Sequence, residues 1–259
     1  MGIQTWFDPE LSNEIHDLLE EVSSDAVTDQ TQSPSSSEKL EVNYPEKNYP
    51  GKNYPGTDYP GTDLTSIPVV TKSESDVSVN TLDELNNRIS QCELCELHTS
   101  RRQVITGEGD VTAKLFIITD APIDDTAGDN SLLSIENKKM LQSMLGTIDC
   151  SLSDVFVSGL VKCKPPEQRL PQTSEMICCD DHLSAQIKLV QPDVIMVLGE
   201  LASQQLLVSQ KSLTDLRLRQ HKHLGVPVYA SYHPEDMFNS SETKRKVWAD
   251  LLQISNHIQ

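Results

Sequence analysis

Short apolar runs alternate with amphipathic segments through the C-terminal two thirds of the chain. The runs are 115–118, 155–157, 194–198 and 226–229, and their lengths and Val and Ile content predict buried strands. Helical spacing of apolar residues occurs at 136–145, 173–190 and 200–208, and a last helix is expected at 242–256. This alternation predicts an α/β fold, a three-layer α/β/α sandwich with a mostly parallel central sheet. Ligands of such sheets bind at the carboxyl ends of the strands, so we expect the chemistry in the loops that follow these runs.

A separate apolar segment lies at the N-terminus. Leu11, Ile15, Leu18, Leu19 and Val22 fall on one helical stripe, behind two apolar pairs. A helix of about twelve residues is only marginally stable alone in water, so residues 1–22 are expected to dock on a partner protein. Packing against the chain's own C-terminal domain is the alternative. The expected contact residues are Gly2, Ile3, Trp6, Phe7, Leu11 and Ile15.

Residues 23–81 are rich in Ser, Thr, Pro, Asn and Asp. Within them a Tyr-Pro pair recurs every five residues, at Tyr44, Tyr49, Tyr54 and Tyr59. Proline fixes φ and favours extended backbone at the residue before it, so this array predicts a disordered spacer, with a Tyr-Pro ligand for some partner as the alternative. The expected organisation is a docking peptide at 1–22, a linker at 23–81 and one domain at 82–259.

The charge of the chain is unevenly distributed. The 259 residues carry 21 Lys and Arg against 39 Asp and Glu, a net charge of −18, and residues 1–85 hold −13 of it. This balance argues against a chain coated in basic surface for nucleic acid but leaves room for a local basic patch in the rest. No run approaches the roughly 18 to 20 apolar residues that span a bilayer, and no secretory signal pattern is present, so we expect a cytoplasmic protein without a membrane partner.

Five of the six cysteines are spaced as metal ligands. Cys92 and Cys95 form a Cys-x2-Cys pair, Cys163 follows in a Pro-rich loop, and Cys178 and Cys179 come next. Four thiolates from distant pairs can surround a zinc ion or an iron-sulfur cluster, and spacing alone does not separate the two. Unligated cysteines that happen to gather are the simpler alternative, and Cys150 is expected to be an ordinary small apolar residue.

Basic residues flank the third cysteine. Lys162, Lys164 and Arg169 could contact DNA phosphates beside the metal site, and ordinary solvated charge explains them equally well.

The order of motifs resembles the family 4 uracil-DNA glycosylases over about residues 89–252. The matching stretches are CELC at 92–95, VITGEGD at 104–110, KLFIITDAP at 114–122, VFVSGLVKCKPPEQRLP at 155–171, EMICC at 175–179, QIKLVQPDVIMVLG at 186–199 and YHPED at 232–236. The resemblance implies an α/β/α sandwich that carries a 4Fe-4S cluster. It implies Cys92, Cys95, Cys163 and Cys179 as ligands, with Cys178 as the alternative to Cys179 and zinc as the alternative to the cluster.

The chain departs from this family where a flipped base would be held. The family's Gly-Glu-x-Pro-Gly motif reads Thr-Asp-Ala-Pro-Ile at 119–123. The segment Ser131-Leu132-Leu133 stands nearest to the place of the Pro-Phe pair whose ring stacks on uracil, and Gly159 replaces the base-reading asparagine. An active enzyme of this family would retain Asp120 and His233 as its catalytic groups.

These departures lead to our first interpretation, a non-catalytic replication accessory protein. The segment Gly2-Ile3-Gln4-Thr5-Trp6 resembles the N-terminal peptide of the psi subunits of the bacterial DNA polymerase III clamp loader. That resemblance implies binding to the chi subunit, to the clamp-loader ATPase subunits and indirectly to single-stranded-DNA-binding protein. The alternative is a divergent family 4 uracil-DNA glycosylase that excises uracil or another base, and a third reading is a cluster-bearing DNA-binding protein of repair.

Overall fold

Six strands form one central sheet in the computed structural model, which describes residues 79–124 and 130–258. Their order across the sheet is β1-β5-β2-β6-β8-β7. The four inner strands run parallel, and the two edge strands pair antiparallel to their neighbours. The expected mostly parallel sheet is therefore confirmed. The strands are β1 (Glu108–Gly109), β2 (Leu115–Thr119), β5 (Val155–Gly159), β6 (Val194–Leu198), β7 (His221–His223) and β8 (Val226–Ser231).

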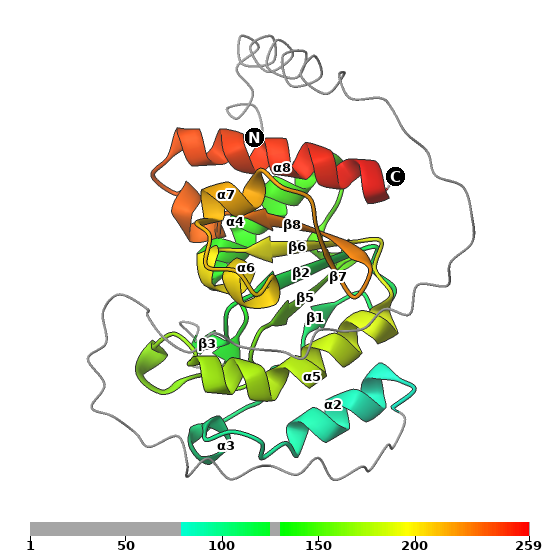
Figure 1. Cartoon of the computed structure of the whole chain (residues 1–259), viewed down its shortest axis with the longest axis vertical. Helices are drawn as coiled ribbons and strands as arrows, with labels where there is room; N and C mark the ends of the chain where they lie inside the picture. The colour runs from blue at the N-terminus through cyan, green and yellow to red at the C-terminus, as the bar shows by residue number, and fades with distance from the viewer. Residues whose placement is uncertain (1–78, 125–129, 259) are drawn as a thin grey trace, which may run out of the picture. The chain divides into compact units, whose positions relative to one another are not determined.

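Helices cover both faces of this sheet, as Figure 1 shows. One layer contains α4 (Ile135–Leu145) and α8 (Ser241–Ile258), and the opposite layer contains α2 (Leu82–Ser90) and α5 (Thr173–Val190). Shorter helices complete the domain: α3 (Leu97–Ser100), α6 (Glu200–Leu206), α7 (Leu213–Arg217) and the 3-10 turns η2 (Gly146–Ile148), η3 (Leu152–Asp154), η4 (Pro166–Gln168) and η5 (Pro234–Met237). Ile123–Asp124 (β3) and Asn130–Ser131 (β4) form a separate two-stranded ribbon.

Alternate residues of each inner strand feed two different hydrophobic cores. On β2, Leu115 and Ile117 pack with α4 and α8, whereas Phe116 and Ile118 pack with α5. All five residues of β2 are buried, as expected for a strand with helices on both sides. Since side chains alternate along a strand, this continuous apolar run builds the three-layer sandwich.

Local sequence defines where the main helices begin. The Ser134 hydroxyl caps α4 by accepting the Asn137 backbone N–H at 3.1 Å. At the start of α5, Glu175 accepts the Gln172 backbone N–H at 2.7 Å. Each of these bonds satisfies a donor that the first turn of a helix leaves free.

The carboxyl ends of the inner strands carry the loops in which chemistry was expected. The segments after β2, β5, β6 and β8 all reach this edge of the sheet, where they line one cleft. The expected docking peptide at 1–22 and nearly all of the linker at 23–81 lie outside the described residues, so those boundaries stay predictions. No helix among the described residues is long and apolar enough to cross a membrane.

Candidate active site and cysteine cavity

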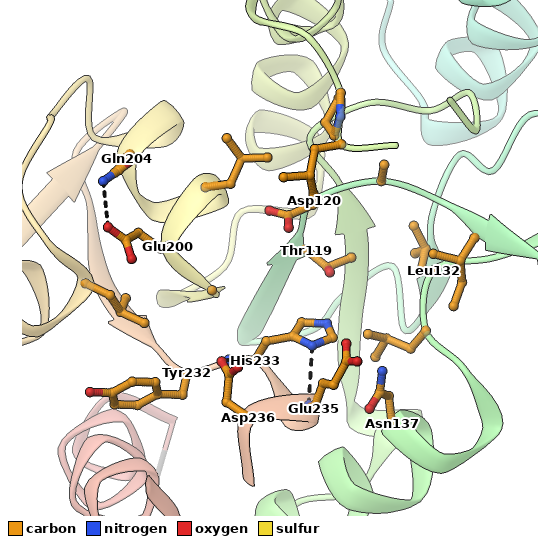
Figure 2. A pocket seen from close by; sticks show the side chains of 18 of the residues that line it. Thr119, Asp120, Leu132, Asn137, Glu200, Gln204, Tyr232, His233, Glu235 and Asp236 are labelled. Atoms are coloured by element: carbon orange, nitrogen blue, oxygen red, sulfur yellow. Dashed lines mark hydrogen bonds between the residues drawn. The ribbon is translucent and has the colours of Figure 1, made fainter. Parts of the chain in front are cut away.

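A cleft of about 960 Å³ lies at the carboxyl edge of the sheet (Figure 2). Its walls come from the four loops after the inner strands and from the start of α4. Asp120 and His233, the two catalytic candidates from the sequence, both line it. Figure 2 shows Asp120 on one side of the cleft and His233 with Asn137 on the other.

Asp120 follows β2 and holds a largely desolvated carboxyl group. Burial raises the pKa of Asp120 to about 6, and the backbone N–H of Ala202, which donates to the carboxylate, limits the rise. Its Oδ1 atom is buried and has no hydrogen-bond partner among the described residues. A buried acceptor without a partner costs about 1–3 kcal/mol, so a hydrogen bond from a ligand would stabilise this carboxyl group.

His233 enters the cleft from the loop after β8. The backbone N–H of Glu235 donates to Nδ1 of His233 at 3.3 Å (Figure 2), and Asp236 accepts the His233 backbone N–H at 3.2 Å. Burial lowers the pKa of His233, although Asp236 and Glu235 oppose this effect. Because Nδ1 accepts a hydrogen bond, the neutral imidazole carries its proton on Nε2 and can donate it to a ligand.

A buried ion pair fixes the end of β8 just before His233. Arg217 donates to both oxygens of Asp250, at 2.9 Å and 2.7 Å, and Ser231 donates to Asp250 at 2.6 Å. The Arg217 guanidinium also stacks 4.8 Å from the centre of the Tyr232 ring. These contacts join α7, β8 and α8, so they determine where the loop that carries His233 begins.

The position expected to read a base holds Gly159, at the end of β5. A Cβ atom there would lie 2.7 Å from the Val161 carbonyl oxygen and 3.3 Å from Leu132 Cδ2. The first distance is shorter than van der Waals contact allows, so the backbone around Val161 excludes a side chain at 159. Leu132, which lines the cleft, occupies the space beside it.

Asn137 supplies an amide to the same cleft from α4, and the sequence analysis missed it. Its side chain is only 7% exposed, and its Oδ1 atom has no hydrogen-bond partner in the described part of the chain. In the sequence this residue is one polar position in an amphipathic helix, so no local pattern distinguishes it.

The basic residues near Cys163 have different environments. Lys162 is 1% exposed, and its Nζ donates to Ser158 Oγ and to the Gly159 carbonyl, both at 2.7 Å. This burial excludes direct phosphate contact by Lys162. Lys164 pairs with Asp124, and Arg169 donates to both carboxylate oxygens of Glu175 at 2.9 Å and 2.6 Å. DNA contact through Lys164 and Arg169 stays a prediction.

Five cysteines line one small cavity between α2, α3, α5 and the loop after β5. They are Cys92, Cys95, Cys163, Cys178 and Cys179. Burial raises the pKa of Cys95, Cys163 and Cys178, and it raises that of Cys179 to about 11. Cys150 lies elsewhere, as expected, with its thiol 3.7 Å from the Ser151 carbonyl.

Hydrogen-bond donors already face these sulfurs. Arg101 donates to the Cys163 sulfur at 3.5 Å and to the Cys92 carbonyl at 2.7 Å. The backbone N–H of Lys162 donates to the Cys179 sulfur. Donors aimed at sulfur stabilise metal-bound thiolates, so the residues present fit a thiolate-ligated group.

The cavity offers several candidate ligands for a zinc ion or an iron-sulfur cluster. Within the described residues, no three His, Cys, Asp or Glu side chains are placed to hold one metal ion. A zinc site requires four ligands within about 2.3 Å of one point, whereas a four-iron cluster binds each thiolate on its own iron. His98 and His182 line the cavity with the five cysteines, and thiolate and imidazole ligands occur in both zinc and iron-sulfur sites.

Together the fold and the cleft define an α/β/α protein with a ligand-binding site at the carboxyl edge of a parallel sheet. The chain belongs to the uracil DNA glycosylase superfamily, whose family model matches residues 106–252. It is 28% identical over 182 residues to a type-4 uracil-DNA glycosylase of Thermotoga maritima, covering 69% of this chain and 95% of that protein. Type-4 uracil-DNA glycosylases of Archaeoglobus fulgidus and Pyrobaculum aerophilum are 26% and 32% identical, over 68% and 66% of this chain and 92% and 91% of theirs.

These relatives contradict the interpretation of the chain as a non-catalytic, psi-like replication protein. Nearly their whole length aligns with the C-terminal domain, and they are named as glycosylases. The interpretation gave too much weight to the departures from the family pattern at 119–123, at 131–133 and at 159. The cleft nevertheless keeps a carboxyl group, an imidazole and an amide at Asp120, His233 and Asn137. The psi-like peptide and its expected partners lie outside the described residues and are not tested.

Proposed function

We propose that the chain is a DNA glycosylase that hydrolyses the N-glycosidic bond of uracil in DNA repair. The observation that carries the proposal is the meeting of Asp120 and His233, from the ends of β2 and β8, in one cleft at the edge where this fold binds ligands. Uracil is the base in the names of the relatives. The base must leave the DNA stack to enter the cleft.

His233 would stabilise the departing base. Its Nε2–H can donate to a carbonyl oxygen of the pyrimidine, because Nδ1 is held by the Glu235 backbone N–H. When the C1′–N1 bond breaks, its electron pair leaves with the base, and negative charge grows on that oxygen. A fixed donor at this point lowers the barrier without a charge of its own.

Asp120 would act on the sugar and on water. Its ionised carboxylate stabilises the positive charge that develops on the deoxyribose as the bond breaks. The carboxylate can also accept a proton from the water whose oxygen attacks C1′. The products are the base, which leaves as an anion and takes a proton from solvent, and an abasic deoxyribose, and the proton from the water rests on Asp120 until solvent removes it.

We also propose that Cys92, Cys95, Cys163 and Cys179 hold a 4Fe-4S cluster. Cys179 is favoured over Cys178 because it is 8% exposed and receives the Lys162 N–H. When bound, the cluster would supply a covalent tie between the α2–α3 segment, the loop after β5 and α5. That loop continues to Gln168 and Arg169 in the cleft wall.

The test is base release from a uracil-containing oligonucleotide by the full chain. We expect release by the unchanged protein, and a loss of about 10²–10⁴-fold in Asp120→Asn and in His233→Ala. The matched control is Asp193→Asn, an exposed carboxylate at the amino end of β6. Asp193→Asn should keep full activity. No release from single- or double-stranded substrate would overturn the proposal.

A further inference from the structure

One polar side chain in the cleft has no task in the mechanism above. Asn137 is more than nine-tenths buried, and its Oδ1 lacks a partner among the described residues. It occupies the third position of α4, where a side-chain acceptor commonly bonds back to the start of the helix. Here the cap at Ser134 uses only the Asn137 backbone N–H. The residue lines the cleft, and no other group among the described residues engages this oxygen.

The surroundings of position 159 explain why this amide matters. Gly159 offers no side chain, and the Val161 carbonyl oxygen, 2.7 Å from a Cβ built there, prevents one from being added. Leu132 fills the neighbouring space with methyl groups. Any hydrogen bonding to the edge of a bound base must therefore come from another direction.

The geometry points to Asn137 as the residue that reads the base, an inference that rests on the proposed glycosylase function. We propose that Oδ1 of Asn137 accepts the ring N–H of a base and that its Nδ2 donates to the adjacent carbonyl oxygen. His233, drawn on the same side of the cleft in Figure 2, can meet a second carbonyl through Nε2–H. The ligand class is a pyrimidine with an N–H between two carbonyls, as in uracil.

The apolar lining and the hydrogen-bond pattern together select which base the cleft accepts. Leu132 and Leu133 line the cleft beside Asn137 and offer no polar group to an additional substituent. Cytosine lacks the ring N–H at this edge and presents an acceptor there, which would face the Asn137 oxygen. A site built to pair with a donor rejects a base that lacks it, because a buried acceptor is then left unpaired.

The test separates base reading from catalysis. The full chain is titrated with single-stranded oligonucleotides that carry one 2′-fluoro-2′-deoxyuridine or one 2′-fluoro-2′-deoxycytidine, in which fluorine blocks bond cleavage. We expect tighter binding of the uracil probe, and a loss of this preference by about 10- to 100-fold in Asn137→Ala and in the isosteric Asn137→Asp. Lys139→Ala, an exposed change on the same helix, should keep the preference.

Activity assays on ordinary uracil substrate complete the design. If the wild-type chain releases uracil and Asn137→Ala keeps the same kcat/KM and the same preference, the inference about Asn137 fails while the proposed function stands. If the wild-type chain prefers uracil without releasing it, and Asn137→Ala loses the preference, base reading stands while catalysis fails. If the wild-type chain neither releases uracil nor binds the uracil probe preferentially, the proposed function and the inference about Asn137 are both overturned. Thermal unfolding of each variant identifies any loss that comes from misfolding.

Discussion

The carboxyl group of Asp120 changes its charge within the ordinary working range of enzymes. Burial raises the pKa of Asp120 to about 6, so the group is mostly protonated at pH 5 and mostly ionised at pH 7. Burial also lowers the pKa of His233, which favours its neutral imidazole. Asp120 therefore reaches its proposed working state on the alkaline side of about pH 6.

This arrangement predicts the pH dependence of base release. Since the ionised carboxylate is required, kcat/KM should rise about tenfold per pH unit below about 6 and level off above it. Asp120→Asn should lose this rise along with most of the activity, and Asp193→Asn should keep it. A rate that falls as the pH increases from 5 to 7 would contradict the assignment of Asp120 as the ionised group.

Sequence motifs predicted Asp120, His233 and the cysteines as site residues, and the structure brings the first two into one cleft and five of the cysteines into one cavity. Asn137 could not be found that way. It is a candidate because its Oδ1 atom is buried without a hydrogen-bond partner among the described residues, and only the three-dimensional structure reveals this. The predicted phosphate contact of Lys162 is wrong for a related reason. In the folded chain its amine is buried after β5, where it donates to Ser158 Oγ and to the Gly159 carbonyl.

At the scale of secondary structure, periodicity was a good guide to the interior elements. The helix expected at 173–190 is α5 itself, and the four apolar runs are the four inner strands. The edge strands β1 and β7 and the short helix α7 were not predicted. Their residues are half-exposed and few, so tertiary contacts rather than periodicity determine their conformation.

The cysteine cavity joins elements that are distant in sequence, and it allows a prediction at this scale. Anaerobically purified protein should absorb visible light and contain about four irons per chain. Cys179→Ser should remove nearly all of the iron, whereas Cys178→Ser and the control Cys150→Ser should retain it. Colourless protein with zinc would contradict the cluster, and iron loss in Cys178→Ser alone would exchange the two ligands.

At the scale of the whole molecule, the distribution of charge along the chain bears more on the proposed DNA contact than the net charge does. The chain carries −18, yet −13 of this lies in residues 1–85, which precede in sequence the cleft residues and all of the candidate cysteine ligands. Around the cleft the candidate phosphate contacts are already paired, Lys164 with Asp124 and Arg169 with Glu175. DNA must therefore compete with these carboxylates for the same cations.

This competition predicts how DNA affinity responds to single charges. Lys164→Ala should reduce the slope of log affinity against log salt by about 0.9, the amount expected for one lost phosphate contact. Asp124→Asn should raise the affinity, because it frees the Lys164 amine. Lys188→Ala, in the last turn of α5 and at the opposite edge of the sheet, serves as the control. Equal affinities and slopes for all three variants would show that Lys164 is ordinary solvated charge.

The close approach of the Val161 carbonyl to Gly159 has a consequence for the history of this cleft. An amide side chain at 159 cannot be introduced by one substitution, because the backbone at Val161 and the methyl groups of Leu132 would both have to move. Replacing glycine by an amide residue at 159 therefore needs coordinated changes at three positions, namely 132, 159 and 161. Such epistasis makes the arrangement around Asn137 hard to reverse by stepwise mutation, and related chains with glycine at 159 should carry a bulky aliphatic residue at 132.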